Sequence, residues 1–126
     1  IYAVTVWSYF IESDEKYNYV IKLLEKAKSK KLISALCRYF DFNTEKNMKN
    51  EVQKILLNKL ETIKTEYSIR TIIGTLVRIR NEENIANLKK YIEIQSPDFK
   101  EMVKWEIKIN VPEIERGKIE NDLNIK

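Results

Sequence analysis

The sequence predicts an all-α fold in a single domain spanning residues 1–126, and three observations lead to this prediction. Apolar residues recur at offsets of three and four along most of the chain, which is the period of an amphipathic helix. Only 2 Gly and 2 Pro are present, too few for the closely spaced turns of a β-sandwich. Polar turn regions recur roughly 30 to 40 residues apart, a spacing typical of repeated helix pairs; they are residues 9–15, 39–45, 79–83 and 107–113.

Three helices are predicted in the first 40 residues. Tyr2–Ile11 is apolar along most of its length, and Ser13 is a suitable N-cap for a second helix, Asp14–Lys28. A third helix, Lys31–Phe40, follows a basic connection. The candidate core residues of these helices are Val6, Tyr9, Phe10, Tyr17, Val20, Ile21, Leu24, Ala27, Leu32, Ile33, Leu36, Tyr39 and Phe40.

Two longer helices are predicted in the middle of the chain. Thr44 is expected to cap the first, Glu45–Lys64, and the second begins at Thr65 or Glu66 and ends near Arg80. Gly74 lies inside the second helix, where it costs about 1 kcal/mol relative to Ala, and we expect it to permit close packing of two helices. The candidate core residues are Met48, Val52, Ile55, Leu56, Leu60, Ile63, Ile69, Ile72, Ile73, Leu76 and Ile79.

The last third of the chain carries two strong helix-start signals. Asn81 is predicted to cap the helix Glu82–Ile94, and Ser96 with Pro97 at the first helical position begins the helix Pro97–Ile109. Residues 110–126 have weak periodicity and are expected to form either a capping helix or a frayed tail. The candidate core residues are Ile85, Leu88, Tyr91, Ile92, Phe99, Met102, Val103 and Ile107.

Composition excludes several classes of site. The chain contains no His and a single Cys, Cys37, which removes the common zinc ligands, Ser–His and Cys–His nucleophiles and any internal disulfide. Cys37 falls in an apolar helical run, so we expect a buried structural thiol. No metal or cofactor is expected, and no run of roughly 18 apolar residues predicts a membrane span. These features favour a cytoplasmic protein. Because the chain begins with Ile rather than Met, we expect a fragment or a mature product.

One helix pair has a recognisable pattern. The segment Ile69–Leu76, followed by Arg78–Ile85 and Leu88, resembles a HEAT repeat, and Met102–Glu106 is similar to the start of another. The resemblance covers most of Tyr2–Ile109 as about three and a half helix pairs. It implies a right-handed α-α superhelix whose second helices line a concave binding surface.

Two features depart from the HEAT pattern. The usual glycine and Asp-Pro of the turn are replaced by Arg80-Asn81-Glu82-Glu83, and the small residues of the outer helix survive mainly at Gly74 and Ala35. These departures leave a compact, irregular helical bundle as the alternative fold.

Alignment of the second helices predicts a polar ladder. Lys22, Lys54 and Asn87 occupy equivalent positions, and Lys26, Asn58 and Tyr91 follow four residues later on the same helical face. Such a ladder would recognise an acidic protein surface or a phosphate backbone. Solvation of the helices by a lysine-rich chain is the simpler interpretation, and Tyr91 also fits the core.

Trp105 is a further candidate binding residue, because it lies beside the main apolar stripe of its helix. Exposed, it would anchor an interface. We favour the alternative, in which it packs beneath the C-terminal tail.

Together these features predict a non-enzymatic protein-binding module: a scaffold, an adaptor or an inhibitor of the immunity-protein type, whose partner has an acidic surface. Exposed end helices make a homodimer a second kind of partner. The alternative is a nucleic-acid binder, because the formal net charge is +4. A HEAT-like DNA glycosylase is the least favoured hypothesis, since no motif position of that group matches. The lysines on which the nucleic-acid alternative depends are Lys22, Lys26, Lys54, Lys89 and Lys90.

Overall fold

The computed structural model describes residues 14–43 and 49–125, which fold into seven α-helices without a strand. The all-α prediction is therefore confirmed for this part of the chain. The predicted helix Tyr2–Ile11 and the predicted caps Ser13 and Thr44 lie outside the described residues. The helices are α2 (Asp14–Lys26), α3 (Lys30–Asn43), α4 (Lys49–Thr62), α5 (Glu66–Arg78), α6 (Glu82–Glu93), α7 (Pro97–Asn110) and α8 (Glu113–Asp122).

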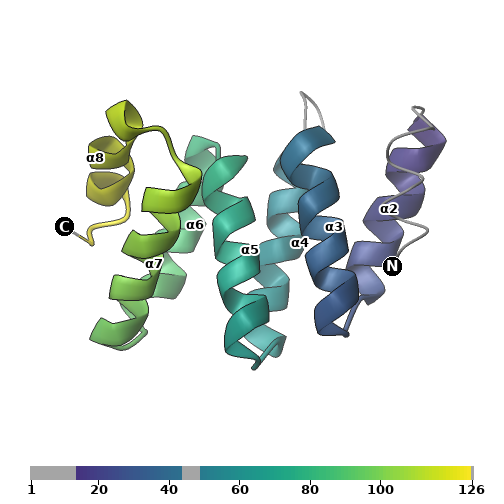
Figure 1. Cartoon of the computed structure of the whole chain (residues 1–126), viewed down its shortest axis with the longest axis horizontal. Coiled ribbons are helices and arrows are strands. Elements are labelled where there is room, and N and C mark those ends of the chain that lie inside the picture. The colour runs from purple at the N-terminus through teal and green to yellow at the C-terminus, as the bar shows by residue number, and fades with distance from the viewer. Residues whose placement is uncertain (1–13, 44–48, 126) are drawn as a thin grey trace.

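The helices form a two-layered stack, with α2 and α8 at opposite ends (Figure 1). Helices α3, α5 and α7 pack side by side in one layer, while α2, α4, α6 and α8 form the other. Each helix therefore contacts the helix two places along the chain. This open order of contacts is that of stacked helix pairs, and it argues against a closed irregular bundle. None of the helices in residues 14–43 and 49–125 is long and apolar enough to cross a bilayer.

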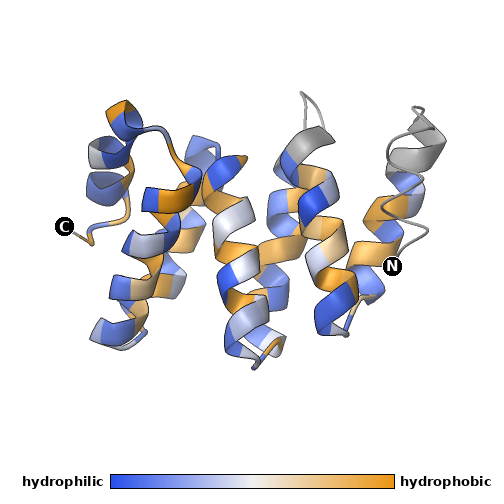
Figure 2. Cartoon of the chain, in the orientation of Figure 1, coloured by the Kyte–Doolittle hydropathy of each residue, from blue (hydrophilic) through white to orange (hydrophobic). Residues whose placement is uncertain are grey.

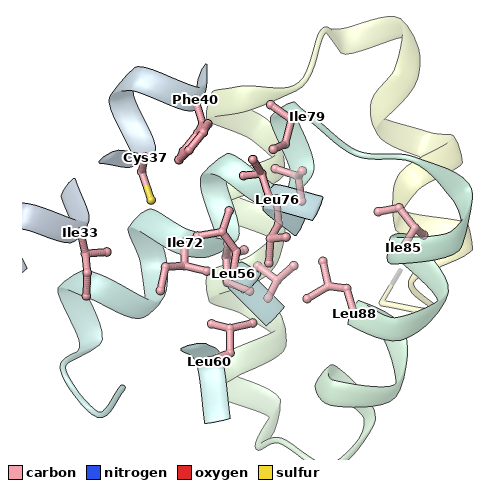
Figure 3. Close-up of a cluster of buried hydrophobic side chains, with 14 of the residues drawn as sticks. Ile33, Cys37, Phe40, Leu56, Leu60, Ile72, Leu76, Ile79, Ile85 and Leu88 are labelled. Atoms are coloured by element: carbon pink, nitrogen blue, oxygen red, sulfur yellow. The ribbon is translucent and has the colours of Figure 1, made fainter. Parts of the chain in front are cut away.

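The core lies between the two layers, where the apolar faces of the helices meet (Figures 2 and 3). Phe40 from α3, Leu56 from α4, Ile72 from α5 and Leu88 from α6 are fully buried there and contribute to one continuous cluster. The predicted stripes are confirmed wherever their side chains are described, with Leu32, Ile55, Ile63, Ile69, Tyr91, Phe99 and Met102 only partly buried. Cys37 is also buried, as predicted.

Packing is closest in the layer of α3, α5 and α7. Gly74 of α5 faces α7, and a Cβ atom added to it would lie 2.9 Å from Asn110 Nδ2 and 3.1 Å from Glu106 Oε1. The predicted role of Gly74 in close helix packing is therefore confirmed. Helices α4 and α6 contact each other less extensively, which leaves space between their exposed faces.

Hydrogen bonds join successive helix pairs at a nearly constant interval. Most of these side chains bond partners 31 to 36 residues away, and Gln53 bonds Ile79 O, 26 residues away. Each helix pair is thus bonded to the next at similar places. Lys59 Nζ on α4 donates to Ala27 O at 2.6 Å and to Glu25 O at 3.3 Å, which satisfies carbonyl groups at the end of α2. Tyr91 Oη on α6 donates to Leu60 O of α4 at 3.3 Å.

The predicted caps at Asn81 and Ser96 are confirmed. The Asn81 side chain accepts from the backbone N–H of Asn84, and Ser96 accepts from that of Phe99. Asn50 Oδ1 on α4 accepts from the side chains of Asn81 and Asn84, so α4 also holds the start of α6. This polar cluster fixes the turn that lacks the usual glycine and Asp-Pro.

Several boundaries differ from the prediction, among them the end of α2 at Lys26 rather than Lys28. Helix α3 continues to Asn43 rather than ending at Phe40, because Tyr39 and Phe40 are buried and extend its inner face into the expected turn. Helix α4 ends at Thr62, two residues early. In the tail, α8 forms and Ile119 is buried against the stack, together with Leu123 and Ile125 beyond the helix.

The two glycines allow a matched test of close packing. A Cβ added to Gly117 of α8 meets nothing within 4 Å, so Gly117→Ala is expected to raise the free energy of unfolding by about 0.5–1 kcal/mol. The free energy of unfolding of Gly74→Ala is expected to be about 1–2 kcal/mol lower than that of Gly117→Ala. The reason is that Asn110 and Glu106 must move and weaken their interhelical bonds. Urea denaturation of both variants measures the difference, and equal stabilisation would show that α5 and α7 can separate at little cost.

Candidate functional site

Four of the seven predicted binding residues surround one groove between α4 and α6. They are Lys54 and Asn58 from α4 with Asn87 and Tyr91 from α6. The groove has a volume of about 520 Å³. We call it the α4–α6 groove, and its other lining residues are Leu57, Glu61, Lys90 and Ile94.

Tyr91 is held in this groove by two contacts. Its ring packs edge-on against Phe99, with 5.6 Å between the ring centroids, while its hydroxyl donates to Leu60 O. Burial, and then the charge of Glu61, raises the pKa of Tyr91, so the hydroxyl stays protonated as a donor. One part of the ring therefore belongs to the core and another to the groove wall, which reconciles both predicted roles.

The remainder of the groove combines apolar surface with charges of both signs. Ile94 is 81% exposed at the C-terminal end of α6, and Leu57 is partly buried on α4. Lys54 Nζ lies 3.9 Å from Glu83 Oε1, and this exposed pair contributes little to stability. A groove of this mixed character can accept an apolar anchor and also orient polar groups around it.

Lys22 and Lys26 lie outside this groove. Lys22 is exposed on α2, and Lys26 lines a separate pocket at the end of that helix. The structure thus brings together the half of the predicted ladder on α4 and α6 but does not join it to the half on α2.

The prediction that Trp105 packs beneath the tail is wrong. Trp105 is 50% exposed, and the Lys108 ammonium lies 5.3 Å from the centroid of its ring. Ile109, four residues later on the same face of α7, is exposed as well. The physical reason is that α7 is the last described helix of its layer, while α8 packs elsewhere, on α7 and α6. Trp105 therefore lies apart from the α4–α6 groove.

Sequence reasoning missed a second groove, of about 300 Å³, on the opposite layer. We call it the polar groove. A signal for it existed, because Arg38 and Arg78 occupy equivalent positions when the first helices of the pairs are aligned. Its lining residues are Ser34, Cys37, Arg38, Asp41, Tyr67, Thr71, Gly74, Thr75, Arg78, Glu106 and Asn110.

Charges in the polar groove are largely paired with one another. Arg70 Nε on α5 lies 3.2 Å from Glu106 Oε2 on α7, beside the groove. Arg78 Nη2 donates to Asn110 Oδ1 at 2.9 Å, and Arg78 Nε lies 3.8 Å from Asp41 Oδ1 on α3. These contacts cross the whole layer, so the side chains of the groove link α3, α5 and α7 to one another.

Burial raises the pKa of two side chains that line the polar groove, Cys37 and Asp41. Burial raises the pKa of the Cys37 thiol to about 12, despite its hydrogen bond with Thr75. Burial also raises the pKa of Asp41, an effect that the Thr75 hydrogen bond and the Arg78 and Arg38 charges oppose. A thiol with so high a pKa is neither a nucleophile nor a metal ligand at neutral pH.

No protein-family model, curated protein or solved structure matches this chain. The function of each groove is therefore inferred from its own geometry. The α4–α6 groove leaves an exposed apolar residue and exposed lysines available, whereas the charges of the polar groove are occupied within the fold.

The raised pKa of Asp41 gives stability a defined pH dependence. The folded protein holds the Asp41 proton more tightly than the unfolded chain, so stability falls as pH rises from the ordinary value of 3.8 through the folded pKa. Asp41→Asn removes this loss. Its free energy of unfolding relative to the original protein is therefore expected to be greater at pH 7 than below pH 3.8.

Urea denaturation across this pH range measures the difference. Glu93→Gln, which removes an exposed carboxylate 4.0 Å from Lys89, is the control for loss of one negative charge and is expected to show little change. A relative free energy of unfolding of Asp41→Asn that is lower at pH 7 than below pH 3.8 would mean that the Arg78 ion pair outweighs burial.

Proposed function

We propose that this chain is a non-enzymatic protein-binding module of the HEAT-like helical-repeat kind, and that the α4–α6 groove receives its partner. The repeat is supported by interhelical hydrogen bonds between residues 31 to 36 positions apart and by the two-layered order of the helices. A scaffold, an adaptor and an inhibitor all use a surface of this type.

One observation carries the proposal. Four of the six residues selected from the sequence alignment lie around a single groove, and that groove also contains the exposed apolar side chain of Ile94. Exposed large apolar residues next to polar rims are typical of protein interfaces. Tyr91 adds an aromatic wall that is already ordered by Phe99, so little conformational entropy is lost when a partner binds.

The chemistry of the groove indicates the partner's surface. Lys54 and Lys90 contribute positive charge, and Glu61 is the one acidic lining residue. An amphipathic segment fits this arrangement if an apolar side chain contacts Ile94 and Leu57 and carboxylates face the two lysines. The partner's surface is thus expected to be acidic around an apolar centre.

This proposal does not depend on a concave face. The closest packing lies in the layer of α3, α5 and α7, whereas the α4–α6 groove arises because α4 and α6 are less tightly packed. The assignment of the second helices to the inner curve of a superhelix stays a prediction. The groove between two helices is sufficient for binding a segment.

Nucleic-acid binding is the second candidate, supported by the net charge of +4. Its lysines do not form a continuous phosphate-binding track, because Lys54 faces Glu83 and Lys89 faces Glu93. We therefore rank it below protein binding. A cytoplasmic location remains part of the proposal and is supported by the free, buried thiol of Cys37.

The test is capture of a partner from native cell extract by the immobilised protein, with half of the extract treated with nuclease. We expect a discrete protein band that survives nuclease treatment and is lost with Ile94→Lys. A fall in affinity of at least about tenfold is expected, because the substitution places a charge in the centre of the groove. Lys90→Glu is expected to weaken capture through repulsion.

Ile114→Lys is the matched control, since Ile114 is 92% exposed on α8, outside the groove. The proposal fails if Ile114→Lys abolishes capture equally or if Ile94→Lys leaves it unchanged. Retention of nucleic acid that disappears at moderate salt would favour the second candidate.

A further inference from the structure

A third pocket lies where α2 and α4 end and α5 begins, and the proposed function does not use it. Its volume is about 500 Å³. Four lysines and one glutamate line it, which makes it the most positive of the three pockets described here. We call it the helix-junction pocket, and its lining residues are Glu25, Lys26, Ala27, Lys28, Lys59, Thr62, Ile63, Lys64, Thr65 and Ser68.

Lys59 is the fixed charge of this pocket. It is only 8% exposed, and its ammonium donates to Ala27 O and Glu25 O, which uses two of its three N–H groups. No carboxylate of the described residues forms an ion pair with it. Burial, and then the charge of Lys28, lowers the pKa of Lys59, and the charge of Glu25 opposes this shift.

The first turn of α5 supplies free backbone donors to the same place. Thr65 occupies the N-cap position, but its side chain makes no capping hydrogen bond. The backbone N–H groups that such a bond would satisfy remain available, and the helix dipole favours negative charge there. Asn81 and Ser96, by contrast, cap α6 and α7 with their own side chains.

Ser68 provides an independent sign that the pocket is built for a ligand. The residue is only 2% exposed and lines the pocket. Among the described residues its hydroxyl has no hydrogen-bond partner, whereas the hydroxyl of Thr71 on the same helix donates to Tyr67 O. The hydroxyl oxygen keeps contact with solvent on the side of the pocket, so a ligand oxygen that enters the pocket can accept its hydrogen bond.

We propose that the helix-junction pocket binds a phosphate group, either as the free ion or as a small phosphate monoester. The Lys59 ammonium, the first turn of α5 and the Ser68 hydroxyl are donors of different kinds from two helices, and the several oxygens of a tetrahedral phosphate can accept from all of them. The flexible side chains of Lys26, Lys28 and Lys64 add charge at the rim. Binding there would join the end of α2 and the start of α5 through α4.

Thermal unfolding of the whole chain in inorganic phosphate tests the proposal, with chloride at equal ionic strength as the reference. We expect a saturable rise of the melting temperature in phosphate and one bound phosphate per chain by calorimetric titration. Ser68→Ala is expected to fold normally, because the hydroxyl that it removes is unpaired. It should nevertheless reduce phosphate affinity by about tenfold.

Lys64→Gln should reduce the affinity as well, whereas Lys100→Gln on α7 makes the same change in net charge outside the pocket and should leave it unaltered. Methyl phosphate distinguishes a phosphate monoester from the free phosphate ion as the ligand. Binding at least as tight as that of inorganic phosphate assigns a monoester ligand, and much weaker binding assigns the free ion.

The proposal is overturned if phosphate and chloride give the same melting temperature. It is also overturned if Ser68→Ala and Lys64→Gln retain the full response, or if Lys100→Gln loses it. Ile94→Lys is expected to keep the full response, so this result is independent of the α4–α6 groove.

Discussion

The structure depends on how its helix ends are satisfied, because none of the described helices exceeds 14 residues. Helices this short are marginal in isolation, and their last carbonyl groups lack partners within the helix. Here α4 supplies partners to two neighbours. Lys59 donates to the end of α2, and Gln53, itself buried, donates to Ile79 O at the end of α5 at 2.7 Å. The stack is thus joined at its helix ends as well as through its apolar core.

This arrangement also determines where surfaces remain available. In the layer of α3, α5 and α7, Gly74 permits close packing, and polar side chains pair between these helices, Arg70 with Glu106 and Arg78 with both Asp41 and Asn110. In the other layer, α4 and α6 are linked mainly through Tyr91 and the Asn50 cluster near their two ends. The exposed faces between those links stay apart, and this separation creates the α4–α6 groove.

The sequence was sufficient to predict features that arise from local periodicity and capping. The stripes of α5 and α6, the Asn81 and Ser96 caps and the close contact at Gly74 all follow from residue type and spacing. It was insufficient where the result depends on which helix lies opposite. Trp105 has the same local pattern whether or not a helix covers it, and the pairing of Asp41 with Arg78 joins residues from different helices. For the same reason, the sequence alone did not show that Lys22 and Lys26 lie outside the α4–α6 groove.

Lysines that look alike in the sequence therefore have different physical roles. Lys54 and Lys89 are exposed beside carboxylates, where water and ions screen their charge and the pairs contribute little. Lys59 is buried, bonded to two carbonyl groups and in no ion pair with the described residues, so solvent screens its charge less. Net charge alone does not separate these cases. Burial and hydrogen-bond partners separate these cases. Within the described residues they identify the end of α4, rather than the exposed ladder, as a place where a positive charge is weakly screened.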